Sequence, residues 1–179
     1  VYQSTGEYEL AEKSFKRAIS LKRDFSRARN NYAAFLYSQE RYEEAEEQLQ
    51  VVIKDTLYES RPRAFINLGL CRVRLGNNEG AREAFTRALT MDRGNTLALL
   101  ELAHIEYDES NWADAERYLE TYRRSVRRQS ARALWLGVRL AHALQDVDAQ
   151  ASAALALRNL YPDSAEYQAY EQAVQSGQL

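Results

Sequence analysis

The sequence predicts an all-α fold in which helix-turn-helix units stack into a solenoid. Ala, Leu, Glu and Arg dominate the chain, and its 179 residues include only 7 Gly and 2 Pro. These are strong helix formers, and turn residues are too few for an all-β fold. A pattern of small, large and small side chains also recurs along the whole chain, and recurrence at a fixed period indicates a repeat architecture.

The pattern is clearest between Gly76 and Arg93, where Ala81, Phe85 and Ala88 lie four and three residues apart. Residues at this spacing share one helix face, so small side chains let a partner helix approach while the ring fills the gap. The first small residue recurs at intervals of 34, 36, 34 and 34 residues, at Ala11, Ala45, Ala81, Ala115 and Ala149. The period and pattern are those of the tetratricopeptide repeat (TPR), so we expect a right-handed TPR solenoid with these residues in its core.

We expect a single TPR domain over residues 1–179. Residues 1–25 form a truncated repeat, in which Gly6 opens a turn before a helix over 7–22. In the later repeats Leu68-Gly69 and Leu136-Gly137 stand where a missing side chain lets neighbouring helices touch. The full repeats are expected at 26–61, 62–95, 96–129 and 130–163.

A capping helix is expected at residues 164–179, covering the end of the stack. Tyr161-Pro162 ends the last repeat, because Pro cannot continue a helix. Asp163 is expected to cap the final helix, with Glu166 completing a capping box. Tyr167, Tyr170 and Val174 share one face of this helix and give it an apolar side.

The 36-residue interval places two extra residues between the second and third repeats, within Lys54–Arg63. Pro62 begins the next helix, where its missing N–H costs nothing. One interpretation is a tolerated loop insertion, and the other is a family-specific corner with Tyr58 packed into it. The residues alone do not decide between these two interpretations.

Composition and motifs favour binding over catalysis. The formal net charge is −2, so no global attraction to nucleic acid is expected. The single Cys71 lies on an apolar helix face and is expected to be a buried structural thiol. His104 and His142 belong to no metal or nucleophile motif. We therefore expect no enzymatic activity, no metal site, no cofactor and no nucleic-acid partner.

The first helices of the repeats are expected to line a partner-binding groove for an extended or helical peptide. In the fifth repeat the repeat positions fall on Ala131, Leu134, Val138, Ala141 and His142. The alternative is that leucines such as Leu70 and Leu100 pack against neighbouring helices and leave no groove. The candidate groove residues of the second to fourth repeats are Arg27, Asn30, Tyr37, Arg63, Ile66, Leu70, Arg74, Leu100, His104 and Tyr107.

Five arginines cluster at the junction of the fourth and fifth repeats. One explanation is the helix dipole, which favours cations at a helix C-terminus by a few tenths of a kcal/mol each. The other is contact with an anionic surface, either lipid headgroups or an acidic patch on a partner. The five are Arg123, Arg124, Arg127, Arg128 and Arg132.

Four segments of the chain are more specific than a generic repeat. They are NNYAAFLYSQERYEEA at 30–45, DTLYESRPRAFINLGL at 55–70, ARALWLGVRLAH at 131–142 and LYPDSAEYQAY at 160–170. Together these segments resemble the PilF/PilW family, which are type IV pilus biogenesis and stability proteins of Gram-negative bacteria. The resemblance covers nearly the whole chain, and its most specific parts are the two-residue insertion and the Tyr-Pro ending.

This resemblance implies a periplasmic, outer-membrane lipoprotein that acts as a pilotin. Such a protein binds the secretin subunit of the type IV pilus through its TPR surface, and its lipid delivers the pair to the outer membrane. The family's lipid-bearing N-terminal Cys is not in this chain, and Cys71 cannot replace it. Membrane association is therefore expected only through an N-terminal lipid. The alternative function is a generic TPR adaptor for another peptide or protein partner.

Overall fold

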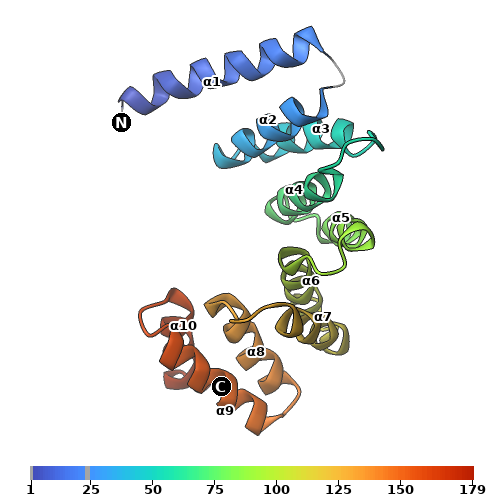
Figure 1. The fold of residues 1–179 in the computed structure, drawn as a ribbon. Helices are drawn as coiled ribbons and strands as arrows, with labels where there is room; N and C mark the ends of the chain where they lie inside the picture. The colour runs from blue at the N-terminus through green and yellow to red at the C-terminus, as the bar shows by residue number, and fades with distance from the viewer. Residues whose placement is uncertain (1, 23–24) are drawn as a thin grey trace. The chain divides into compact units, whose positions relative to one another are not determined.

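The computed structural model describes residues 2–22 and 25–179, which form ten helices and no strand (Figure 1). The chain divides into two compact units, Val1–Arg93 and Gly94–Leu179. In the first unit the helices are α1 (Tyr2–Leu21), α2 (Ser26–Ser38), α3 (Tyr42–Val52), α4 (Arg61–Arg74) and α5 (Asn78–Met91). In the second unit they are α6 (Thr96–Asp108), α7 (Trp112–Ser125), α8 (Ala131–Ala143), α9 (Val147–Leu160) and α10 (Ala165–Gln175).

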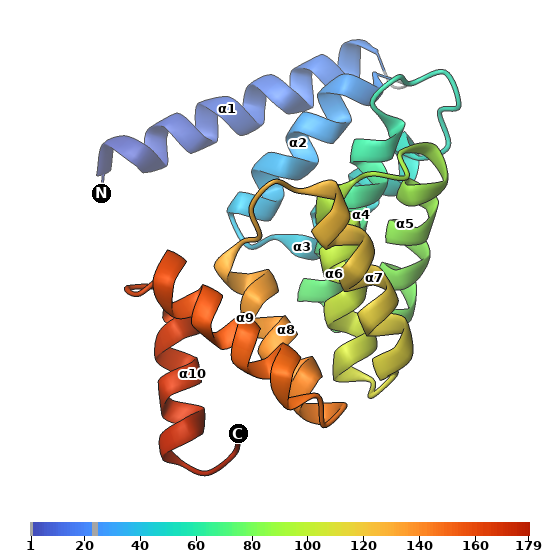
Figure 2. The ribbon, with the colours of Figure 1, turned by 60° about the horizontal axis from the view of Figure 1, so that its bottom comes forward.

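Helices pair in each unit as the repeat pattern predicts. In the first unit α2 packs on α3 and α4 on α5, and α3 also contacts α4. In the second unit α6 packs on α7 and α8 on α9, and α10 lies against both α8 and α9 (Figure 2). The predicted all-α fold of helix-turn-helix repeats is thus confirmed. Among residues 2–22 and 25–179, no helix combines the length and the apolar composition needed to cross a bilayer.

The same turn joins the two helices of each full repeat. One residue in each turn takes a left-handed backbone, with φ of 59° at Glu40, 74° at Gly76, 61° at Ser110 and 59° at Gln145. At Ser110 the turn is closed by two backbone hydrogen bonds, Asn111 N–H to Glu106 O at 2.8 Å and Ser110 N–H to Tyr107 O at 2.9 Å. This pair of hydrogen bonds satisfies carbonyl groups at the end of the first helix, and the turn reverses the direction of the chain.

The predicted core residues of α3, α5 and α7 are buried. Phe85 is fully buried, and a Cβ built on Gly69 would lie 2.5 Å from its Cε1 atom. The Leu-Gly pair of α4 therefore lets the ring lie directly on the α4 backbone. In α9 the prediction is wrong for Ala149, which is exposed, because α9 buries Ala154 and Leu157 instead. Ala153 of the same stripe still faces α8, because a Cβ on Gly137 would lie 3.7 Å from the Ala153 Cβ.

Two predicted helix boundaries are wrong. Gly6 does not open a turn, because α1 runs unbroken from Tyr2 to Leu21. One glycine weakens a helix by only ~0.5–1 kcal/mol, which good helix formers on either side can offset. The capping residue of α10 is Ser164, not Asp163, and its hydroxyl accepts a hydrogen bond from Tyr167 N–H at 3.1 Å.

The corner between α3 and α4 is held by hydrogen bonds at both ends. The Ser26 hydroxyl donates to the Asp55 carboxylate, which lowers the pKa of Asp55. The Arg61 Nε donates to the carbonyl of Ile53 at 2.7 Å. Tyr58 is half-buried within this corner. The two inserted residues therefore belong to an internally bonded turn that precedes Pro62 in the first turn of α4.

Candidate partner-binding surfaces

The candidate groove residues of the first unit differ in exposure. Arg27, Arg63 and Arg74 are exposed, and Tyr37 and Leu70 are half-buried. Asn30 and Ile66 are buried, and the Asn30 side-chain oxygen accepts a hydrogen bond from Asn67 Nδ2 at 3.1 Å. Buried side chains cannot contact a partner without rearrangement, so the accessible members of the predicted set in this unit are Arg27, Arg63 and Arg74, with the partly accessible Tyr37 and Leu70.

Arg74 belongs to an aromatic cluster that joins three helices of the first unit. Its guanidinium lies 5.4 Å from the centre of the Tyr42 ring, and its Nε donates to the Tyr42 hydroxyl at 3.2 Å. Tyr37 meets the same Tyr42 ring edge-on, with 5.1 Å between centres. Arginine stacked on tyrosine is attractive and keeps a planar donor at the surface. The cluster therefore presents an amphipathic, positively charged surface.

In the second unit Leu100 is buried, whereas His104 and Tyr107 are half-buried. Next to them α8 presents Trp135 and Arg139, which lie one residue beyond the predicted Leu134 and Val138. Leu134 is 3% exposed and Val138 is fully buried, so these repeat positions face the core and not a groove. The sequence could have indicated Trp135 and Arg139, since an aromatic residue and an arginine four residues apart share one face of a helix.

Trp135 and Arg139 belong to a row of rings that runs from α6 through α8 to α10. The Arg139 guanidinium lies 4.7 Å from the Tyr107 ring centre and 5.5 Å from that of Trp135. Trp135 then meets Tyr170 edge-on at 6.3 Å, and Tyr170 stacks on Tyr167 at 6.0 Å. The row fixes the orientation of α10 on α8 and leaves partly exposed aromatic faces.

His104 is neutral at physiological pH. Burial lowers the pKa of its imidazole to about 3, with further contributions from the nearby Arg132 and Arg139. Its Nε2 atom is buried and has no hydrogen-bond partner among the described residues. Cys71 is buried as predicted, and burial raises the pKa of its thiol to about 12. Neither side chain is therefore poised for acid–base or nucleophilic chemistry.

Most of the clustered arginines already contact groups within the second unit. Arg123 Nη1 lies 3.0 Å from a Glu116 carboxylate oxygen, and Arg124 Nε lies 2.9 Å from one of Glu120. Arg132 makes a two-pronged ion pair with the buried Glu101. Arg128 donates to the Leu160 carbonyl and lies over the Tyr161 ring. Arg127 is exposed in the loop after α7, so an anionic contact at this junction stays a prediction that only part of the cluster can support.

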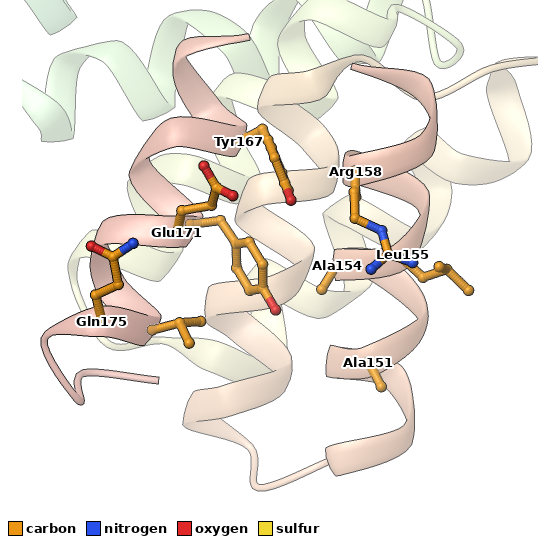
Figure 3. A pocket seen from close by; sticks show the side chains of 9 residues that line it. Ala151, Ala154, Leu155, Arg158, Tyr167, Glu171 and Gln175 are labelled. Carbon is orange, nitrogen blue, oxygen red and sulfur yellow. The ribbon is translucent and has the colours of Figure 1, made fainter. Parts of the chain in front are cut away.

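The second unit also holds an open groove between α9 and α10, with a cavity of about 470 Å³ (Figure 3). On the α9 side it is lined by Ala151, Ala154, Leu155 and Arg158. On the α10 side the lining residues are Tyr167, Tyr170, Glu171, Val174 and Gln175. Figure 3 shows Arg158 and Tyr167 on opposite walls of the groove. A groove with apolar walls and a few charged groups is suited to binding a peptide or a helix.

A family model of the tetratricopeptide repeat matches residues 3–61 and 72–134 of the chain. The type IV pilus assembly protein PilF of Pseudomonas aeruginosa is 38% identical over 171 residues, which cover 96% of this chain and 68% of PilF. The chain belongs to the PilF/PilW family of TPR proteins.

Two solved structures of this family superpose on the chain. The structure of Pseudomonas aeruginosa PilF superposes with a TM-score of 0.86 at 37% identity, covering 96% of this chain and 77% of PilF. PilW, described as a widely conserved type IV pilus biogenesis factor, superposes with a TM-score of 0.81 at 28% identity, covering 94% of this chain and 77% of PilW. The chain is therefore a protein-interaction scaffold related to type IV pilus biogenesis factors.

Proposed function

We propose that this protein is a pilotin-like, non-enzymatic scaffold that assists the outer-membrane localisation or assembly of the type IV pilus secretin. The observation that carries the proposal is the similarity to the type IV pilus assembly protein PilF along 96% of the chain. Similarity confined to the repeat stripe would support only a shared fold. An identity of 38% over 171 residues involves more positions than the small–large–small stripe contains.

The secretin subunit is proposed to bind the exposed faces of the first helices of the repeats. In the first unit these faces carry Arg63 and Arg74, and in the second they carry Tyr107, Trp135 and Arg139. Aromatic and arginine side chains are enriched among residues that dominate binding energy at protein interfaces. The pilotin role places the protein at the periplasmic face of the outer membrane, held there through an N-terminal lipid.

The experiment is a pull-down of the purified secretin subunit by the immobilised full-length protein, with complementation of a Pseudomonas aeruginosa pilF deletion as a second measurement. We expect retention of the secretin subunit and restored secretin multimers on a gel. Arg74→Glu should weaken retention by about tenfold, because it places a charge of the wrong sign in the aromatic cluster. Arg87→Glu on α5 is the matched control, since Arg87 is also exposed but lies on a second helix of a repeat.

Absence of secretin retention by the full-length protein, together with failed complementation, would favour the generic TPR adaptor. If Arg74→Glu and Arg87→Glu weakened secretin retention equally, the scaffold role would still stand. That result would instead contradict the proposal that the first helices of the repeats bind the secretin.

A further inference from the structure

Arg139 of α8 is held at the surface of the second unit by rings from two helices. Its guanidinium lies 4.7 Å from the centre of the Tyr107 ring on α6 and 5.5 Å from that of the Trp135 ring on α8. All three side chains are half-buried. Such contacts attract the guanidinium to the rings and restrict its motion, while its planar fork of donors can still form hydrogen bonds. Arg139 is therefore a preorganised donor at a surface that is partly shielded from water.

The charge of Arg139 has no counter-ion among residues 2–22 and 25–179. No carboxylate in these ranges pairs with it, and no acceptor receives a hydrogen bond from it. Arg123, the other half-buried arginine of the second unit, has its Nη1 atom 3.0 Å from a Glu116 carboxylate oxygen. A charge that has lost part of its hydration is costly unless it is paired. Arg139 would therefore be stabilised by a carboxylate that these residues do not supply.

Unsatisfied polar atoms gather around this guanidinium. Arg139 Nε and His104 Nε2 are both buried, and neither has a hydrogen-bond partner among the described residues. The two side chains are close enough for Arg139 to contribute to the lowered pKa of His104. Buried polar atoms in folded proteins are nearly always hydrogen-bonded. Two unsatisfied atoms at one place therefore favour a site that binds a polar group.

The other charged groups of α6 and α8 near this place are already matched or neutral. Arg132 makes its two-pronged ion pair with the buried Glu101. Glu106, also buried, accepts a hydrogen bond from Asn111 Nδ2 at 2.9 Å. His104 is neutral, because burial lowers the pKa of its imidazole to about 3. A carboxylate from a partner would therefore find at Arg139 a cation that is not already paired.

We propose that Arg139 binds the carboxylate of a glutamate or aspartate within a peptide segment of the protein partner, while Tyr107 and Trp135 contact the residues beside it. Guanidinium and carboxylate groups can pair through two parallel hydrogen bonds. The rings continue from Trp135 to Tyr170 of α10, 6.3 Å between centres, so a peptide finds aromatic contacts on both sides of the acid. That arrangement favours an acid inside a segment over a carboxylate at a chain end. This role of Arg139 rests on the proposed function, in which the first helices of the repeats bind a protein partner.

The test uses the immobilised full-length protein and pools of short peptides whose flanks are random uncharged residues other than tryptophan. One pool has glutamate at the centre and the second has glutamine, and both are blocked at their two ends. Retained peptides are identified and counted by mass spectrometry. We expect the glutamate pool to be retained about fivefold more than the glutamine pool, the upper end for an exposed ion pair. A third pool, with glutamine at the centre and a free C-terminal carboxylate, should be retained no better than the blocked glutamine pool.

Substitutions then locate the site. Arg139→Gln should abolish the preference for glutamate, and Arg139→Lys should keep only part of it, because lysine retains the charge without the planar fork of donors. Arg158→Gln is the matched control, since Arg158 also has no ion pair among the described residues but is exposed on the second helix α9. All pools are applied to each variant. A variant that is partly unfolded loses retention of every pool, and the ratio between pools still reports the site.

Trp135 provides a second measurement in a protein that keeps Arg139. The most strongly retained glutamate peptide is titrated onto a Trp112→Phe variant, in which Trp135 is the remaining one of the two tryptophans. Binding at Arg139 should change the Trp135 emission, because the indole lies 5.5 Å from the guanidinium. The same peptide with glutamine at its centre should need about fivefold more peptide for the same change.

Three results would overturn the proposal. The first is equal retention of the glutamate and glutamine pools, or no retention of either. The second is a preference for glutamate that persists in Arg139→Gln or is lost equally in Arg158→Gln. The third is stronger retention of the pool with the free C-terminal carboxylate than of the glutamate pool, which would make a chain end the ligand. Secretin retention is measured separately. If the secretin subunit is retained but the glutamate preference is absent, only the role of Arg139 fails, and the converse result would contradict the secretin as partner.

Discussion

Replacing Gly69 by alanine tests whether the close contact between α4 and α5 determines the packing of the third repeat. A Cβ at this position would lie 2.5 Å from Phe85 Cε1, 2.7 Å from Cζ and 2.8 Å from Cδ1. The Phe85 ring is fully buried, so it cannot move away without displacing other core atoms. The new methyl group therefore forces overpacking, which typically costs ~1–3 kcal/mol.

The same substitution at Gly137 is the matched control, because Gly137 holds the equivalent position two repeats later. Its nearest neighbour would be Arg123 Nη2 at 3.0 Å, the end of a flexible side chain, followed by Ala153 Cβ at 3.7 Å. Alanine gains about 1 kcal/mol over glycine in a helix interior. Gly137→Ala should therefore be neutral or stabilising by up to ~1 kcal/mol. Gly69→Ala should be less stable than Gly137→Ala by about 1–3 kcal/mol.

The assay is urea denaturation followed by circular dichroism, with each unfolding transition fitted separately because repeat arrays can unfold in parts. Phe85→Leu should cost less in the Gly69→Ala background than in the wild type, since a smaller side chain relieves the clash. This coupling is measured by a double-mutant cycle. A Gly69→Ala protein as stable as Gly137→Ala, with no coupling to Phe85, would refute the close-contact reasoning.

Three further predictions concern packing, turn geometry and charge. Ala81→Arg should cost several kcal/mol, because Ala81 is fully buried at a close helix contact, and an unchanged melting temperature would contradict the repeat register. Ser110→Gly should stabilise the protein by up to ~1 kcal/mol in urea denaturation. A left-handed backbone costs a non-glycine residue ~1–2 kcal/mol, and the greater entropy of glycine in the unfolded chain offsets part of the gain. A loss of stability would argue against the left-handed turn. Hydrogen bonds, of which that from Arg41 has the largest effect, hold the pKa of Glu12 well below its usual 4.5. A carboxylate with a lowered pKa in the folded state stabilises the fold at pH values above its unfolded-state pKa. Glu12→Gln should therefore lower the free energy of unfolding by about 1–2 kcal/mol at pH 7, and this loss should shrink as the pH falls below 4.5. A loss of stability that does not change with pH would contradict the role of the charge.

The period of the repeats could be predicted because it depends on side-chain volume along one helix face. Ala81, Phe85 and Ala88 are all fully buried, and the glycine under the ring is recognisable beside Leu68. What the pattern does not contain is how deeply each position of a repeat is buried. In α9 Ala149 is exposed, and the large buried side chain is Leu157, which lies outside the alanine stripe. The single domain over residues 1–179 stays a prediction, since the structure describes two compact units.

The candidate groove illustrates the same limit for function. Fixed repeat positions selected Leu134 and Val138 on α8, which are buried, and passed over Trp135 and Arg139 one residue later. A rotation by one residue, about 100° around a helix, is enough to exchange a core face for a surface face. Proposing this surface for binding therefore required the aromatic and arginine neighbours, such as Tyr107, which only the packed structure brings to Arg139.

The arginine cluster could have been interpreted from the repeat period itself. The local sequence around Arg123–Arg132 shows five cations and suggests one exposed patch. In the structure, Arg132 pairs with Glu101, 31 residues earlier, and Arg128 stacks on Tyr161, 33 residues later. The same separation recurs in the first unit, where Arg41 pairs with Glu12 across 29 residues. Neighbouring repeats place residues about one period apart side by side, so a charge in a solenoid is best matched against the residues one repeat away before it is assigned to an external partner.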